Sequence, residues 1–91
     1  MTISFGTTVF DKVSYDRDAD VLYLNVEGTE TARWDESPEG HVLRFDENGD
    51  LCGVTLIGVQ HNLDANGGIT VTVPSREVLD SDELDQALAL A

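Results

Sequence analysis

The chain has 91 residues, of which 18 are Asp or Glu and 5 are Lys or Arg, so its formal net charge at pH 7 is −13. A chain of this length forms one domain with a thin hydrophobic core, and so acidic a surface repels phosphate backbones and anionic lipids. We therefore expect one folded domain that binds neither nucleic acid nor membrane, and whose favoured partners are basic proteins or cations.

The first part of the chain alternates in the way that is typical of β-strands. Apolar and polar or small residues alternate from Ile3 to Val9, residues 12–15 predict a short strand, and Asp16 to Asp20 is rich in turn formers. Residues 21–26 give the clearest strand. Because apolar side chains occupy both of its faces, we expect this strand to be central or covered on both sides.

The middle of the chain predicts a hairpin. Residues 29–36 predict a strand with Ala32 and Trp34 on one face, and residues 37–40 predict a turn. Residues 41–45 and 51–57 then flank an Asn-Gly pair. Asn-Gly between strands favours a type I′ turn, because both residues tolerate positive φ.

Two registers of this hairpin are compatible with the sequence. A three-residue loop sets Arg44 against Cys52 and Phe45 against Leu51. A two-residue turn groups more apolar side chains on one face and is the register that we favour. A type I turn with a glycine bulge stays open. The favoured register gives the pairs Phe45–Cys52, Leu43–Val54 and His41–Leu56.

The C-terminal third predicts a strand and a helix. Residues 63–68 have the composition of a loop, residues 69–73 alternate as a strand that Pro74 ends, and residues 75–79 predict one helical turn. Asp80 and Glu83 have the spacing of a capping box. The helix that follows carries on one face Leu84, Ala87, Leu88 and Ala91.

These elements predict an α+β fold. We expect an antiparallel β-sheet of about six strands built from hairpins, with a C-terminal helix packed on the sheet or at a dimer interface. Residues 1–91 form a single domain without internal repeats or a linker. Because the edge strands of a small sheet need cover, we also expect a homodimer.

Two motifs, taken in their order and separation, resemble a known family. Their residues are Tyr15-Asp16, Asp20 and Leu22-Tyr23, followed by Asp46-Glu47-Asn48-Gly49, Leu51, Gly53-Val54 and Leu56. Residues 13–60 thereby resemble the small bacterial and archaeal domain of unknown function 2283 family, to which residues 61–91 add a strand and the C-terminal helix. The resemblance implies a compact β-rich domain and carries no established activity. Family members commonly have a Gly-Ile-Glu-Ile-like segment where this chain has Thr55 in place of Glu, which puts any activity of that carboxylate in doubt.

Asp16, Asp18 and Asp20 form the most conspicuous chemical motif. Their spacing is that of the first ligands of a calcium loop and Glu27 stands at the twelfth position, yet Val21 replaces the required glycine and begins a strand. We expect these acids to hydrogen-bond backbone amides and shape the turn, and we interpret residues 46–50 in the same way. Catalysis by Asp16 and Asp20 would require a cleft and shifted pKa values.

The other reactive side chains form no characteristic site. Cys52 is the only cysteine, which excludes an intrachain disulfide, and we expect it to be a small buried residue. His41 and His61 are expected at the surface or at an edge, without the ligand spacing of a zinc site. Trp34, beside Arg33, is a candidate interface residue if it is exposed.

The expected function is that of a non-catalytic protein-binding or assembly module without a cofactor. Its expected partners are a second copy of the chain and a basic protein. The alternative is a small metal-dependent enzyme or cation-binding protein that uses the turn of Asp16, Asp18 and Asp20. The N-terminus lacks the features of a signal peptide and no apolar run approaches the roughly 20 residues that span a bilayer, so we expect a cytoplasmic location.

Overall fold

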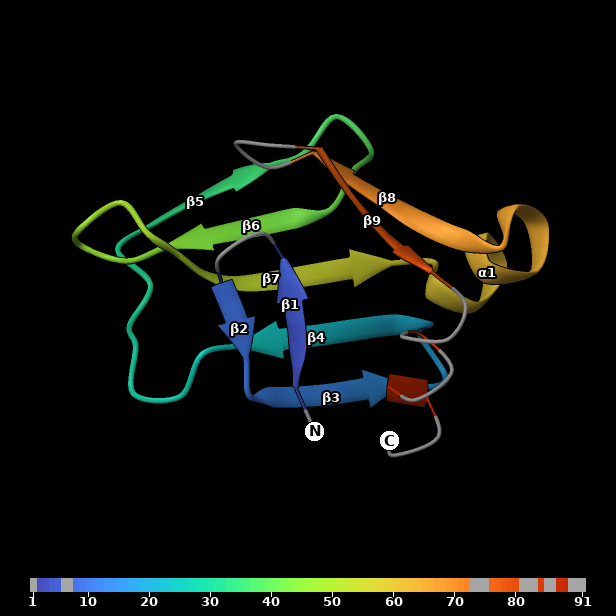
Figure 1. Cartoon of the computed structure of the whole chain (residues 1–91), viewed down its shortest axis with the longest axis horizontal. Coiled ribbons are helices and arrows are strands. Elements are labelled where there is room, and N and C mark those ends of the chain that lie inside the picture. The colour runs from blue at the N-terminus through green and yellow to red at the C-terminus, as the bar shows by residue number, and fades with distance from the viewer. Residues whose placement is uncertain (1, 6–7, 73–75, 81–83, 85–86, 89–91) are drawn as a thin grey trace.

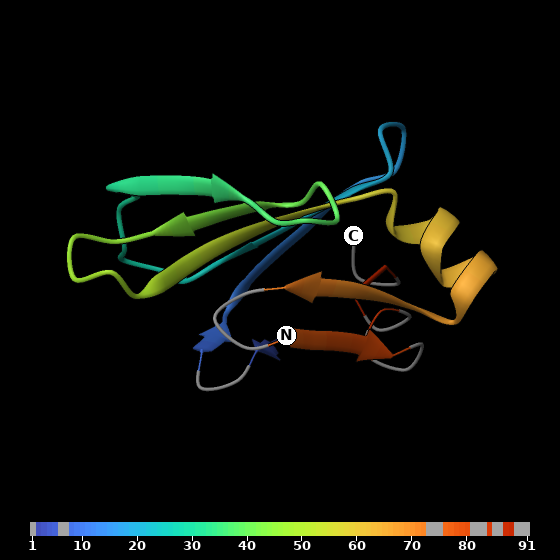
Figure 2. The same cartoon turned by 90° about the horizontal axis from the view of Figure 1, so that it is seen from above.

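The computed structural model describes residues 2–5, 8–72, 76–80, 84, 87 and 88. Its centre is a five-stranded antiparallel sheet with the strand order β3-β4-β7-β6-β5, and two two-stranded sheets pair β1 with β2 and β8 with β9. Figure 1 shows these hairpins in front of the five-stranded sheet, and Figure 2 shows the two layers from above. The strands are β1 (Ile3–Phe5), β2 (Thr8–Phe10), β3 (Lys12–Asp16), β4 (Val21–Asn25), β5 (Arg33–Glu36), β6 (Val42–Phe45), β7 (Leu51–Ile57), β8 (Gly68–Thr72) and β9 (Arg76–Asp80).

The hydrophobic core lies between the two layers. Leu22 and Leu24 of β4 are fully buried, as the alternation of this strand predicts. β4 pairs with β3 on one side and β7 on the other, which confirms that it is central. The other members of the core come from both layers: Ile3, Phe10, Leu43, Phe45, Val54, Leu56, Val59, Ile69, Val71, Leu84 and Ala87.

The β6–β7 hairpin combines the two registers that the sequence left open. Leu43 pairs with Val54, as in the favoured register, but Phe45 pairs with Leu51 rather than with Cys52. A register shift between Arg44 and Phe45 connects the two arrangements. The bulge lets the chain keep apolar pairing along the strands while fitting a longer loop at the turn. The predicted pair Phe45–Cys52 is therefore wrong.

The second layer differs from the prediction in its strands. The expected sheet of about six strands is a sheet of five strands covered by two separate hairpins. The helical turn predicted at residues 75–79 is wrong, because β9 occupies residues 76–80 and pairs antiparallel with β8. Pairing with β9 satisfies backbone groups of β8 that would otherwise form a free edge.

A helix that the sequence did not predict connects the two layers. Helix α1 (Val59–Asn66) replaces most of the loop predicted at residues 63–68. It ends at Gly67, which has a φ of 74° and whose N–H donates to the carbonyl of Leu63. A glycine at this position closes a helix without steric cost, so the Asn66-Gly67 pair is a helix end here.

Most of the predicted C-terminal helix lies outside the described residues, namely 81–83, 85–86 and 89–91. Within the described part, Leu84, Ala87 and Leu88 have helical backbone, and Leu84 and Ala87 are fully buried in the core. These side chains therefore pack with the sheet, whereas nothing supports the alternative placement at a dimer interface.

The opposite face of the five-stranded sheet is open. Directly paired residues of antiparallel strands share a face, so the register sets which side chains lie on it. The five strands contribute Lys12, Ser14, Asp16, Val21, Tyr23, Asn25, Gly53, Thr55, Ile57, Val42, Arg44, Trp34 and Glu36. We call these side chains the open face, and in Figure 2 neither the helix nor the hairpins cover it.

Candidate functional site

The turn after β3 is shaped by the side chain of Asp16. Its Oδ1 accepts hydrogen bonds from the backbone N–H groups of Asp18, at 3.1 Å, and Ala19, at 3.2 Å. A carboxylate that accepts from the next few amides closes an Asx-type turn. Asp16 therefore accepts hydrogen bonds from backbone amides, as the sequence predicts, while Asp18 lies exposed in the same turn.

Asp20 caps helix α1, which begins almost forty residues later. Its backbone carbonyl accepts from the N–H groups of Gly58 and Val59, at 2.9 and 3.3 Å. Its Oδ1 accepts from the N–H of Gln60 at 2.8 Å, and its Oδ2 accepts from that of His61 at 3.2 Å. The first N–H groups of a helix lack partners within the helix, and here one residue from another segment supplies them all.

The same carboxylate accepts a third hydrogen bond, this one from a side chain. The phenolic O–H of Tyr15 donates to Asp20 Oδ1 at 2.7 Å. Burial raises the pKa of Asp20, but the hydrogen bonds from Gln60, Tyr15 and His61 outweigh it, so the pKa lies below its usual value. The same hydrogen bond raises the pKa of Tyr15, because a Tyr15 that lost its proton would set a second anion beside the Asp20 carboxylate.

The three acids do not converge on a shared site. Asp16 accepts from its own turn and Asp20 from α1 and Tyr15. Among the residues that the structure describes, no three His, Cys, Asp or Glu side chains are grouped to hold a metal ion. The hydrogen bonds of Asp16 and Asp20 thus explain both carboxylates as groups that stabilise the fold.

A polar pocket of about 160 Å³ lies where α1 and β8 meet the turn before β6. Its polar lining comes from Glu39, His41, Asn62, Asn66 and Thr70. The sequence offered no local signal for it, because the turn before β6 meets residues 57–70, which follow it only after β6 and most of β7.

His41 is a structural residue of this pocket. It is 3% exposed, so its predicted surface or edge position is wrong; α1 and β8 cover this end of the sheet. Its Nδ1 accepts from the N–H of Ile57 at 3.1 Å. Burial lowers the pKa of His41, and the nearby Glu39 carboxylate and a backbone hydrogen bond to Thr70 oppose this only in part. His61, by contrast, is exposed.

Glu39 joins the turn before β6 to β8. Its Oε1 accepts from the N–H of Thr72 at 2.8 Å, and its Oε2 accepts from the Thr72 hydroxyl at 2.6 Å. These hydrogen bonds, first that of the hydroxyl, lower the pKa of Glu39 to about 2. Glu39 and His41 of the pocket thus make hydrogen bonds within the fold. Cys52, which is not part of the pocket, is 4% exposed and therefore buried as predicted.

The open face presents the remaining candidate, Trp34. This side chain is 72% exposed on β5, and two more large apolar side chains of the same face, Tyr23 and Ile57, are 38% and 44% exposed. Trp34 lies opposite Arg44 of β6 in the sheet register. An exposed tryptophan on an uncovered sheet face is a characteristic of protein interfaces.

Arg44 fixes the centre of the open face. Its Nη1 donates to Thr55 Oγ1 at 2.7 Å, and its Nη2 donates to Asn25 Oδ1 at 2.8 Å. The side chain crosses Gly53 so closely that a Cβ there would lie 2.5 Å from the Arg44 Nε. Thr55 is thus an acceptor for Arg44. The contact ties β4, β6 and β7 together across their solvent side.

No helix in the described part of the chain has the length and apolar character needed to cross a membrane. No curated protein and no solved structure matches the chain. A protein family does: the one described as "protein of unknown function (DUF2283)" matches residues 12–60. These residues run from the start of β3 into α1 and contain all five strands of the central sheet. The chain therefore belongs to the DUF2283 family.

Proposed function

We propose that this protein is a non-catalytic protein-binding module that presents the open face of its sheet to a basic protein. The observation that carries the proposal is the exposure of Trp34, at 72%, on a sheet face that no described element covers. The hydrophobic core packs on the opposite face of the same sheet, and Trp34 takes no part in it.

The composition of the open face supports protein binding over catalysis. Large apolar side chains are interspersed with hydrogen-bonding groups, and Arg44 is held in place by neutral oxygen atoms. Aromatic residues and Arg are enriched at protein interfaces because they bury much surface at little entropic cost. The acids that the sequence made conspicuous, Asp16 and Asp20, cap the turn and the helix instead.

The net charge of −13 supports a partner of the opposite sign. On the open face, acidic Glu36 and Asp16 lie on the two edge strands, where they would surround a docked protein. Acids around an apolar centre raise the association rate with a basic protein and disfavour an acidic one.

Affinity capture from a lysate of the source cells tests the proposal. We expect the wild-type chain to retain basic proteins that high salt releases, and Trp34→Ala to lose them. Val9→Ala is the matched control, because Val9 is 51% exposed but lies on β2 in the other layer. Capture that is absent, or that is equal for wild type and Trp34→Ala, would contradict the proposal.

A further inference from the structure

β5 is an edge strand with a free side. Among the strands that the structure describes it pairs only with β6, and its four residues are all exposed. The view from above in Figure 2 shows β5 with no ribbon in front of it. Such an edge offers unpaired backbone groups to another strand.

The backbone groups of Trp34 point away from the sheet. The N–H of Ser37 donates to the carbonyl of His41, and groups that face the neighbouring strand alternate along an antiparallel ladder. Within β5, Asp35 and Arg33 therefore face β6, whereas Trp34 and Glu36 face outward. The alternation ends just before the strand, where the N–H of Ala32 also donates to β6, at the carbonyl of Phe45. The N–H of Glu36 accordingly bonds to Asp35 Oδ1, at 2.9 Å, instead of to β6.

From this geometry we infer that the chain forms a symmetric homodimer in which β5 pairs antiparallel with β5 of a second copy, centred on Trp34. In this register each Arg33 lies opposite Asp35 of the partner subunit, so opposite charges meet twice. Opposite charges directly across antiparallel strands stabilise a pair, and like charges destabilise it. The sequence of β5 is thus complementary to itself.

In a symmetric dimer a twofold axis passes between the paired strands, and the residue at the centre lies opposite its own copy. The other symmetric registers of β5 place like charges at this axis. Centring the pair on Arg33 sets two cations together, and centring it on Asp35 or Glu36 sets two anions together. Only Trp34 at the axis avoids this, and its outward N–H and carbonyl can then bond to those of the partner subunit. The two Trp34 rings would meet on the open faces, which join into one surface.

The second edge of the sheet is less suited to pairing. Of the residues of β3, Val13 and Tyr15 pack against the core, and Lys12 stands at the start of the strand. A lysine on an edge strand disfavours association with another chain. β5 is therefore the edge that pairs, and β3 serves as its control.

A charge-swap experiment tests both the interface and its register. Arg33→Asp sets Asp against Asp35 of the partner subunit, and Asp35→Arg sets Arg against Arg33 of the partner subunit. We expect each variant to dimerise at least about tenfold more weakly than wild type in sedimentation velocity, and their equimolar mixture to recover the dimer. Recovery in the mixture shows that neither variant failed to fold. Ser14→Asp on β3 should leave the dimer intact.

Three results would overturn the inference. They are a wild-type chain that stays monomeric at every concentration, a mixture that does not dimerise, and loss of the dimer in Ser14→Asp. The homodimer does not depend on the basic partner proposed above. A monomeric chain that still captures basic proteins through Trp34 would refute the homodimer alone, whereas a dimer without such capture would refute the proposed function alone.

Discussion

Asp20 shows how one residue connects two parts of the fold. Its φ of 56° places it in the left-handed region, which Asp tolerates better than most residues. This conformation ends the turn while the backbone carbonyl and the carboxylate both point at the start of α1. The helix has no side-chain cap of its own, since Gly58 stands at its N-cap. The stability of α1 therefore depends on a residue that precedes β4.

The variant Asp20→Ala should lower the free energy of unfolding by about 2 kcal/mol. Loss of a helix cap costs about 0.5–2 kcal/mol, and alanine at positive φ adds about 1 kcal/mol of strain. Asp20→Asn keeps one acceptor oxygen and the tolerance of positive φ, so we expect roughly half that loss. Urea unfolding followed by circular dichroism measures both.

Asp18→Ala removes an equal charge from the same turn and is the control for this comparison. We expect its stability to stay within about 0.5 kcal/mol of wild type, as for most exposed positions. An Asp20→Ala variant as stable as Asp18→Ala would show that the cap contributes nothing.

At the scale of elements, Glu39 holds the turn before β6 against β8. Both of its carboxylate oxygens accept from Thr72, so the contact joins the family-matched region to a strand that follows it. The ionised carboxylate accepts both bonds more strongly than the protonated acid does, because its two oxygens share the negative charge. The attachment of β8 at this point should therefore depend on pH.

The pKa of Glu39 sets the pH range of that dependence. The folded value is about 2 against an ordinary value of 4.5, so the unfolded chain takes up the proton first as the pH falls. The contribution of the Glu39 carboxylate to the free energy of unfolding is fully present above pH 4.5 and is lost as the pH falls toward 2. We expect Glu39→Gln to be less stable than wild type at pH 6 and the difference to shrink toward pH 2.5. Urea unfolding at several pH values measures this.

Two further variants separate the contact from general charge effects. Glu47→Gln removes a carboxylate that is exposed in the β6–β7 loop and controls for the change in net charge. Thr72→Val removes the hydroxyl donor, and if the contact is real the effects of Glu39→Gln and Thr72→Val will not add. Additive effects of the two substitutions, or a stability difference between Glu39→Gln and wild type that is constant with pH, would show that the Glu39–Thr72 contact does not stabilise the fold.

The sequence predicted best those elements whose patterns are local. The alternation of residues 21–26 predicted β4, and Asn48-Gly49 predicted the position of the β6–β7 hairpin, because burial and turn chemistry act within a few residues. The favoured type I′ turn was wrong, since Asn48 does not have a positive φ. The N–H of Gly49, at a φ of 82°, donates to the carbonyl of Asp46, as in a type I turn with a glycine bulge. Helix α1 could not be found in the same way, since its cap is Asp20. β9 was missed because its partner β8, and not its own pattern, makes it a strand.

The features of the candidate site likewise fall into those that local sequence predicts and those that depend on distant segments. The bonds of Asp16 to amides of its own turn follow from spacing, so the sequence could predict them. The burial of His41 depends on α1 and β8, and that of Arg44 on Gly53 of the neighbouring strand. Trp34 was a candidate from the sequence, but its exposure followed only from the position of β5 at the sheet edge.

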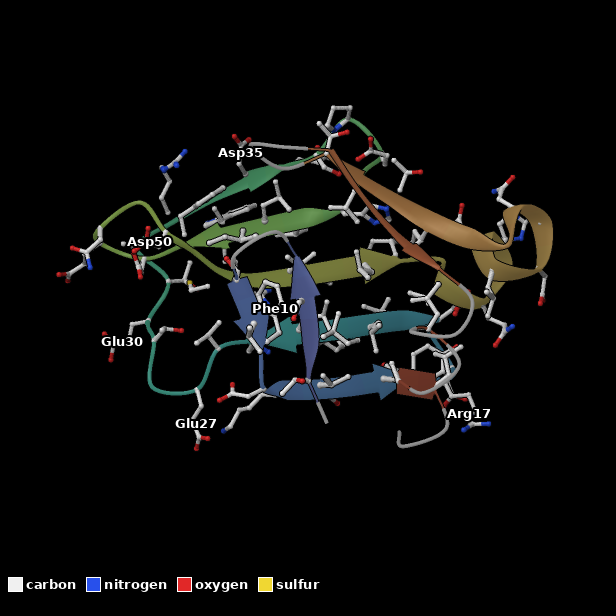
Figure 3. All side chains as sticks on the ribbon, in the orientation of Figure 1. Phe10, Arg17, Glu27, Glu30, Asp35 and Asp50 are labelled. Carbon is white, nitrogen blue, oxygen red and sulfur yellow. The ribbon has the colours of Figure 1, made fainter. Side chains whose placement is uncertain are left out.

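At the scale of the whole molecule, the acidic side chains that the structure describes lie at the margins of a thin core. Figure 3 shows Glu27, Glu30 and Asp50 pointing outward at one end of the sheet, while Phe10 lies over its middle. At this end a hollow of about 320 Å³ is lined by residues of two loops, with Glu30, Asp46 and Glu47 among them. Carboxylates this close repel one another, and the net charge of −13 adds a repulsion that favours expansion.

The melting temperature should therefore rise with salt. The screening length falls from about 30 Å at 0.01 M to about 8 Å at 0.15 M, so distant acids cease to repel one another. The double variant Glu30→Gln, Glu47→Gln should melt about 2–4 °C above wild type at low salt, because relief of roughly 0.5 kcal/mol corresponds to that shift in a small domain. Differential scanning calorimetry at both salt concentrations measures the two effects, and the gain of the double variant should shrink at 0.15 M. Sucrose, which stabilises folded proteins without screening charge, is the control, and a gain unchanged by salt would show that repulsion at this end is negligible.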